Sequence, residues 1–126
     1  MRAVLDTSVV IATEVPPLAG ELAISAATMA ELHFGVLVAH EQAIRAERLR
    51  RLSILQRKFD ALPVDEAVTA SYGQLAAAVA AAGRQPRART MALLIAATAH
   101  AHSARLYTRN ASDLAGVDGL VEIVPL

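Results

Sequence analysis

The sequence predicts an α/β fold in which a central, mostly parallel sheet of four to five strands is flanked by helices. Short apolar runs alternate with longer segments of helical spacing along the whole chain, as in proteins with a parallel sheet. A length of 126 residues suits one domain, residues 1–126, with a sizeable core. The first apolar run ends directly on a carboxylate, an arrangement typical of a strand that leads into a functional loop.

The first strand is expected over residues 3–5, an unbroken apolar run that indicates burial on both faces of the sheet. Asp6 ends this run, and Thr7 and Ser8 lead into a short helix over residues 9–12. Asp6 would then lie at the carboxyl edge of the sheet, where open α/β folds bind ligands. The alternative is that Asp6 only caps the helix that follows it.

The next elements follow from breakers and periodicity. Pro16 and Pro17 mark a loop, residues 21–25 are a candidate second strand, and a helix begins at Ser25 or Thr28 and ends near residue 40. Residues 41–59 have the spacing of a long amphipathic helix, with the favourable pairs Glu41/Arg45 and Glu47/Arg51. The arginines of this helix are either RNA contacts or part of a solvated face with internal ion pairs.

The second half of the chain repeats the alternation. Residues 61–64 are a candidate strand, and Asp65 is expected to cap a helix over residues 66–82 that ends at Gly83. Residues 84–89 form a basic loop, and residues 90–103 form a helix so apolar that it predicts a central packing element. Strands are expected over residues 105–108 and 120–124, with a turn and short helix over residues 109–115 between them.

Composition excludes some classes of site. The formal net charge is zero, so a nucleic-acid partner would have to meet a local basic patch. No cysteine is present, which excludes disulfides and thiolate metal sites and fits a cytoplasmic location. Neither a membrane-spanning apolar stretch nor a signal peptide is recognisable, so no membrane association is expected.

Three acids lie where the predicted sheet would bring them together: Asp6 after the first strand, Glu31 early in the helix after the second, and Asp113 after the strand at 105–108. Each has a structural alternative, since Thr28-x-x-Glu31 and Asn110-x-x-Asp113 both match a capping box. Carboxylates that share a cleft repel one another unless a cation lies between them. Oxygen ligands without His or Cys favour Mg²⁺ or Mn²⁺, which can support phosphodiester hydrolysis.

Four stretches, VLDTSVVIA, SAATMAELHFGV, LLIAATAHAHSARLYTRNASDL and VEIV, resemble the PIN-domain ribonucleases, specifically the VapC toxins of bacterial type II toxin–antitoxin pairs. The resemblance implies a PIN-like fold and a Mg²⁺-dependent endoribonuclease that cuts tRNA or rRNA. It also implies a homodimer and a VapB antitoxin, in a heterotetramer or larger complex, whose C-terminal tail lies across the active-site groove with a basic side chain at the acids. Asp6, Glu31 and Asp113 match three acids of the family motif.

The fourth family acid is missing. Family members usually carry D-x-L-I-A-A-T-A, and here Ala92 stands at the Asp position, with no Asp or Glu between residues 89 and 101. Loss of one ligand should weaken metal binding, so this chain is expected to cleave RNA poorly or not at all. Ala92 is either a deliberate active-site substitution in a harmful toxin or the mark of a natural, degenerate toxin.

Further residues are candidates for supporting roles. Thr7, Thr108 and Asn110 would orient the acids or a water, although ordinary turn and cap chemistry explains them equally well. Four arginines beside the predicted site are candidate RNA phosphate contacts: Arg84, Arg87, Arg89 and Arg109. The histidines have no partners at metal-ligand spacing and are expected to be structural or surface residues.

Two other functions remain open from the sequence. The chain is alternatively a non-catalytic module that only binds an antitoxin or RNA. It is also compatible with a small α/β domain in which all three acids are helix caps.

Overall fold

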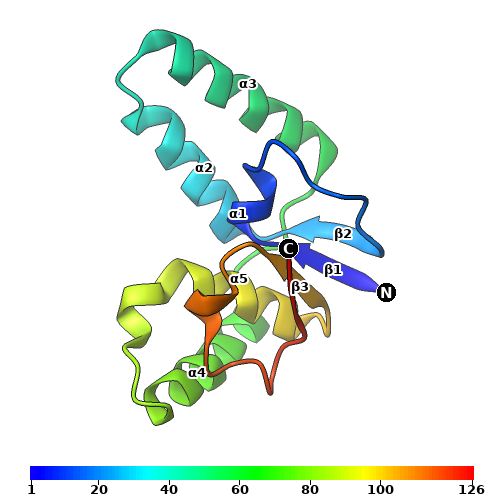
Figure 1. Ribbon diagram of the computed structural model, residues 1–126, viewed down its shortest axis with the longest axis vertical. Helices are drawn as coiled ribbons and strands as arrows, with labels where there is room; N and C mark the ends of the chain where they lie inside the picture. Colours follow the sequence, from blue (N-terminus) through cyan, green and yellow to red (C-terminus); the bar gives the residue numbers. More distant parts are fainter.

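The computed structural model covers residues 1–126 and contains four strands, all parallel, in the order β2-β1-β3-β4 (Figure 1). The strands are β1 (Arg2–Leu5), β2 (Glu21–Ile24), β3 (Arg105–Thr108) and β4 (Ile123–Pro125). The helices are α1 (Thr7–Val10), α2 (Ala26–Val38), α3 (Gln42–Lys58), α4 (Glu66–Ala81) and α5 (Thr90–Ala101), with 3₁₀ turns η1 (Pro86–Arg89) and η2 (Ala111–Leu114). The predicted α/β class and parallel sheet are confirmed.

Both faces of the sheet are buried, as the apolar run in β1 predicts. Val4 points into the larger core, which α4 and α5 build on one face. Ala3 and Leu5 point to the opposite face, where Val9 of α1 and the loop after it cover them. This alternation follows from the two-residue period of a strand. The carboxyl ends of β1 and β3 therefore meet at one edge.

Helix α5 is the central packing element that its composition predicts. Leu93, Ile95 and the alanines at 96, 97 and 99 are buried, and α5 packs on both β1 and β3. Helix α4 packs along α5, and Asp65 caps it by accepting a hydrogen bond from the Val68 N–H (3.0 Å). Gly83 follows α4 with φ +80°, as expected for a glycine just after a helix.

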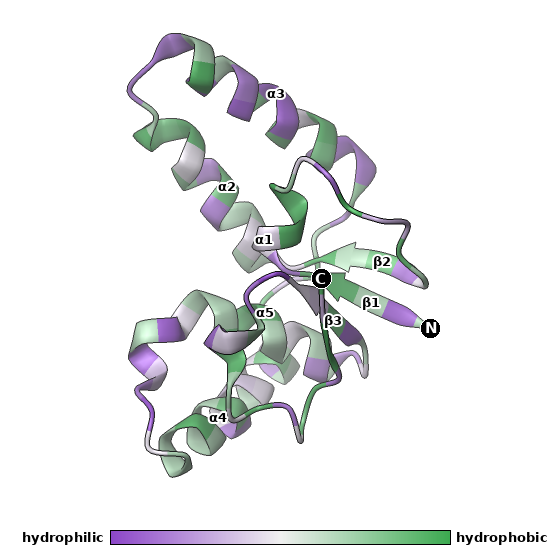
Figure 2. Cartoon of the chain, in the orientation of Figure 1, coloured by the Kyte–Doolittle hydropathy of each residue, from purple (hydrophilic) through white to green (hydrophobic).

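Helices α2 and α3 form a hairpin that projects away from α4 and α5 (Figure 1), while the start of α2 packs on α5 and Ala27 joins the larger core. The long helix expected over residues 41–59 is α3, and Leu52 is the only buried residue in it. Figure 2 shows hydrophilic segments recurring along α3.

The two ion pairs predicted within α3 are absent from the structure. Neither Glu41/Arg45 nor Glu47/Arg51 forms: Arg50 pairs with Glu47, and Arg45 donates to the carbonyls that end α2. The Arg45 guanidinium therefore joins α3 to the C-terminal end of α2.

Two predicted strand boundaries are wrong. Residues 61–64 contribute a single bridge, Leu62 to Ser25, because Pro63 has no N–H with which to extend a ladder. The last strand begins at Ile123 instead of residue 120, because Leu120 and Val121 donate to the Val117 carbonyl in a turn. No helix in the structure combines the length and hydrophobicity needed to cross a membrane.

Candidate active site

Asp6 lies at the carboxyl end of β1 and is buried, with 8% of its surface exposed. Its Oδ2 accepts hydrogen bonds from Ser8 Oγ (2.6 Å) and Thr108 Oγ1 (2.9 Å). The carboxylate makes no capping bond to α1, so the alternative that Asp6 is a simple side-chain cap is wrong. The two hydroxyls fix one oxygen of Asp6 and leave Oδ1 without a protein partner.

Glu31 lies in the second turn of α2 and is held by a hydroxyl from α1. Thr7 Oγ1 donates to Glu31 Oε1 at 2.6 Å and also lies 3.1 Å from Thr28 Oγ1. The predicted Thr28–Glu31 capping box is wrong, because Ser25 is the N-cap of α2 and Thr28 is buried inside the helix. Glu31 is thus held by the first residue of α1, not by the end of its own helix.

Asp113 lies in η2, the short turn that follows β3. Its carboxylate makes no hydrogen bond and no ion pair, and its side chain is exposed. Asn110 is the N-cap residue of η2, but its side chain bonds no backbone group, so the alternative of an Asn110–Asp113 capping box is wrong. The Asn110 N–H instead donates to Thr108 Oγ1 (3.0 Å), which ties the turn to the hydroxyl that holds Asp6.

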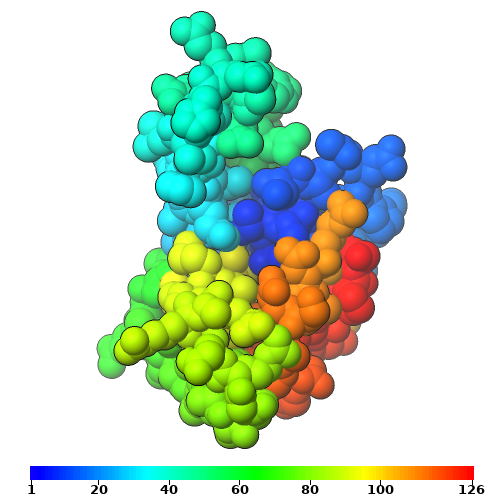
Figure 3. All heavy atoms as spheres, turned by 60° about the vertical axis from the view of Figure 1, so that its left-hand side comes forward, coloured from blue at the N-terminus to red at the C-terminus, as the bar shows by residue number.

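All three acids line one cavity of about 250 Å³, here called the acidic cavity. Figure 3 shows α1, the start of α5 and the orange turn η2 meeting on one face of the molecule. The side chains that line the acidic cavity come from α1, α2, α5, η2 and the residues beside α1 and η2: Asp6, Thr7, Ser8, Ile11, Glu31, Ala92, Ile95, Asn110 and Asp113. Ala92 contributes a methyl group to the wall, at the position where the resemblance in the sequence leads us to expect a carboxylate.

A divalent cation fits the chemistry of this cavity, because only oxygen donors face it and each acid retains an oxygen without a protein partner. No group of three acids or histidines is close enough to hold an ion by itself. Mg²⁺ characteristically binds one or two carboxylates and keeps several waters. These oxygen donors therefore suit an ion that keeps most of its water ligands, and they do not suit an ion coordinated by protein atoms alone.

Ser8 is a supporting residue that sequence reasoning missed. Its Oγ donates to Asp6, accepts the Arg109 N–H (3.0 Å) and lies 3.4 Å from Thr108 Oγ1. Thr7 and Thr108 lie where they were expected, each bonded to an acid. The signal for Ser8 was its position two residues after Asp6, where a short side chain can reach back to the carboxylate.

The four candidate RNA-contacting arginines divide into two groups. Arg87 and Arg89 line a cavity of about 440 Å³, the η1 cavity, whose wall shares Glu31, Ala92 and Asp113 with the acidic cavity. Arg84 and Arg109 line neither cavity.

The histidines contact residues away from the acids. His100 bonds Ser71, His102 bonds Arg2, and His33 contacts Gln56, whereas His40 is exposed.

Comparison with known proteins identifies relatives over almost the entire chain. The PIN domain family model matches residues 3–120. The chain is 41% identical to ribonuclease VapC8 of Mycobacterium tuberculosis over 75% of this chain and 88% of that protein. It is 36% identical to ribonuclease VapC5 of the same organism over 95% of this chain and 90% of that protein.

Solved structures agree with these matches. The VapBC-5 toxin–antitoxin structure from Mycobacterium tuberculosis superposes with a TM-score of 0.84 and 34% identity, covering 99% of this chain and 97% of that chain. FitAcB from Neisseria gonorrhoeae superposes with a TM-score of 0.75 and 30% identity, covering 96% and 95% of the two chains.

Proposed function

This chain belongs to the PIN-domain family, with VapC ribonucleases among its relatives, and we propose that it is a VapC-type endoribonuclease toxin. In this proposal Mg²⁺, or Mn²⁺ in its place, is the cofactor, and tRNA or rRNA is the substrate. The products carry a 5′-phosphate and a 3′-hydroxyl. The observation that carries the proposal is the acidic cavity, where Asp6, Glu31 and Asp113 converge at the carboxyl edge of the sheet.

Asp6 and Glu31 would hold the cation from the carboxyl end of β1 and from α2, with Asp113 facing it from η2. When bound, such an ion activates a water and offsets charge on the leaving oxygen of a phosphodiester. The protein's own task is orientation: Ser8 and Thr108 fix one oxygen of Asp6, and Thr7 fixes one oxygen of Glu31. The remaining oxygen of each of these two acids would be available to hold the ion, because no protein donor bonds it.

Ala92 lowers the activity of this form in the proposed mechanism. Its methyl group faces the acidic cavity and the η1 cavity, so both lack a carboxylate at the start of α5. One fewer negative charge weakens attraction for a cation, and one fewer oxygen weakens its positioning. We expect this chain to cleave RNA slowly or not at all.

Repair of position 92 tests the proposal. The chain and its Ala92→Asp variant are incubated with bacterial total RNA in Mg²⁺, in Mn²⁺ and in EDTA, and the fragment ends are identified. Cleavage by Ala92→Asp that EDTA abolishes is the expected result. The control combines Ala92→Asp with Asp6→Asn and should be inactive. Equal rates of RNA cleavage by the unaltered chain and the Ala92→Asp variant would refute the proposal that Ala92 lowers activity.

A non-catalytic binding module is the second candidate, favoured by the absence of any three-acid cluster close enough to hold an ion. Repair distinguishes the two, because a module that has lost its whole site gains nothing from one carboxylate. An inactive Ala92→Asp variant that nevertheless binds RNA or an antitoxin would favour this candidate. The alternative in which all three acids only cap helices fails, because neither Asp6 nor Glu31 makes a capping bond.

The proposed protein partner is a VapB-type antitoxin, with which two toxin copies would assemble into a heterotetramer or larger complex. Supporting this, a cavity of about 460 Å³, the α3 cavity, continues from the acidic cavity and has an apolar rim on which Phe34 is 68% exposed. An antitoxin tail with apolar residues and one basic side chain would match that rim and the acids beside it. Light scattering of the chain alone and with a co-expressed antitoxin measures both assemblies.

A further inference from the structure

Arg87 and Arg89 are not the only arginines beside the acidic cavity. A second pair, Arg48 and Arg51, comes from α3. Both line the α3 cavity, which shares Thr7, Ile11 and Glu31 with the acidic cavity. The η1 cavity shares Glu31, Ala92 and Asp113 with the acidic cavity. Three cavities that share wall residues form one continuous groove, basic at both ends and acidic in the middle.

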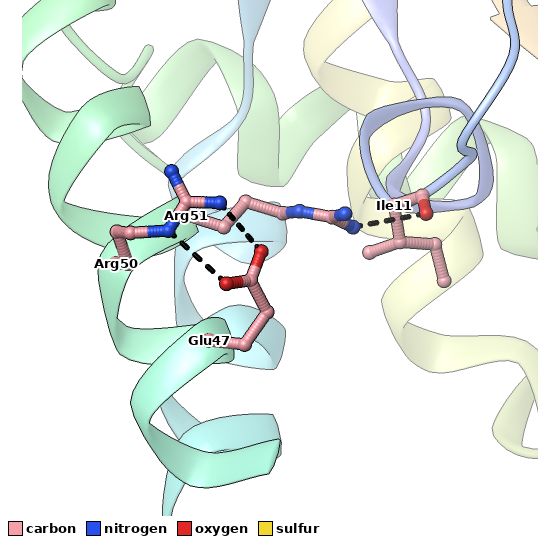
Figure 4. Close-up of polar contacts among 4 residues, drawn as sticks. All are labelled: Ile11, Glu47, Arg50 and Arg51. Atoms are coloured by element: carbon pink, nitrogen blue, oxygen red, sulfur yellow. Dashed lines mark hydrogen bonds and ion pairs between the residues drawn. The ribbon is translucent and has the colours of Figure 1, made fainter. Parts of the chain in front are cut away.

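The two α3 arginines are fixed in place by the backbone of neighbouring elements. Arg51 Nη1 donates to the Ile11 carbonyl (3.0 Å) at the end of α1, and Arg48 Nη1 donates to the Gly35 carbonyl (2.7 Å) in α2. Figure 4 shows Arg51 extended toward Ile11. Each guanidinium has five N–H donors, so one bond to a carbonyl leaves several free. Anchored side chains lose less conformational entropy when a ligand binds.

Neighbouring Arg50 behaves differently. It forms a two-point ion pair with Glu47, at 2.6 and 3.1 Å (Figure 4), and this pair holds the pKa of the Glu47 carboxyl below its usual value through the hydrogen bond and the charge. Its charge is therefore balanced within α3, whereas no carboxylate is bonded to Arg48 or Arg51. Positive charge without an acidic partner remains on the groove side of the helix.

We propose that Arg48 and Arg51 bind backbone phosphates of a single-stranded RNA segment on one side of the scissile phosphate. Arg87 and Arg89 bind phosphates on the other side. This rests on the proposed ribonuclease function and adds the path of the substrate strand across the site. The alternation of basic, acidic and basic groups suits a phosphodiester chain, because flanking phosphates meet guanidinium groups while the reacting phosphate faces the acids. It also explains how a protein of zero net charge holds RNA.

The test is fluorescence anisotropy with a labelled single-stranded RNA of mixed sequence, in Mg²⁺ and over a series of salt concentrations. The chain is compared with the double variant Arg48→Gln/Arg51→Gln. The control, Arg57→Gln/Lys58→Gln, removes the same charge from the exposed end of α3. We expect about tenfold weaker binding for the double variant and a salt slope smaller by about 0.7 per lost phosphate contact. The control should change binding by about twofold or less.

A further variant, Arg48→Lys/Arg51→Lys, separates phosphate binding from structural support, because lysine keeps the charge but not the anchoring fork. It should retain most of the RNA affinity and the salt slope even if its melting temperature falls. Equal losses in the lysine and glutamine variants, or equal binding by the glutamine variant and the unaltered chain, overturn the proposal. RNA binding that is unaffected while antitoxin binding is lost overturns it too and assigns this wall to the protein partner. If the unaltered chain binds no RNA, the proposed function itself fails.

Discussion

Thr108→Val removes a hydroxyl from the most enclosed part of the site. Thr108 is fully buried, and its Oγ1 donates to the Asp6 carboxylate (2.9 Å) and accepts the Asn110 N–H (3.0 Å). Valine has nearly the same shape, so no cavity forms, and only the polar contacts are lost. A hydrogen bond to a charged group contributes about 1.5–3 kcal/mol, and Asn110 is exposed enough for water to replace its bond. We expect the free energy of unfolding to fall by about 2 kcal/mol.

Urea unfolding of the variant and the unaltered chain measures this difference. With a slope of about 2 kcal/mol per molar urea, the midpoint should move down by about 1 M. Thr69→Val is the matched control, because Thr69 is exposed and its hydroxyl bonds only the Glu66 carbonyl of its own helix. It should cost about 0.5 kcal/mol or less. Equal midpoints for Thr108→Val and Thr69→Val would show that the Asp6 carboxylate does not depend on this hydroxyl.

Two further substitutions test the scaffold around the site. Ser25→Ala should lower the free energy of unfolding by about 1–3 kcal/mol, since Ser25 caps α2 through the Ala27 N–H and bonds Thr98 in the buried core. A loss under about 0.5 kcal/mol in urea unfolding would contradict this reasoning. Ser103→Gly should raise the melting temperature by about 2–5 °C, since Ser103 has φ 51° just after α5 and glycine adopts that conformation freely. Calorimetry that shows no increase would argue against strain at this position.

The parallel sheet and the long helices could be predicted because their signals are local. The apolar run of β1, the cap and terminal glycine of α4 and the apolar composition of α5 each define an element within a few residues. The two errors in strand boundaries lie where a nearby residue interrupts the strand. Pro63 allows only one bridge to the edge of the sheet, and Leu120 joins a turn that Val117 closes.

The acids of the site were found from the sequence, but the bonds that orient them were not. The spacings Thr28-x-x-Glu31 and Asn110-x-x-Asp113 match local capping boxes, yet the structure uses neither. Glu31 is bonded by Thr7, which is 24 residues away, and Asp6 by Thr108, which is 102 residues away. A local pattern cannot exclude such long-range partners, because only the packed sheet brings α1, α2 and β3 to one edge.

The distribution of hydrogen bonds in the acidic cavity separates two tasks that the proposed metal site would have to perform: holding the acids in place and binding the cation. Asp6 Oδ2 and Glu31 Oε1 are committed to hydroxyl groups of the protein, so these bonds stabilise the fold whether or not an ion is present. Asp113 has no such bond and is exposed, so its carboxylate contributes charge with little structural support. An aspartate at position 92 would add a carboxylate from α5, which supplies none to the cavity now. Without it the scaffold remains intact, and the proposed loss falls on cation binding, not on folding.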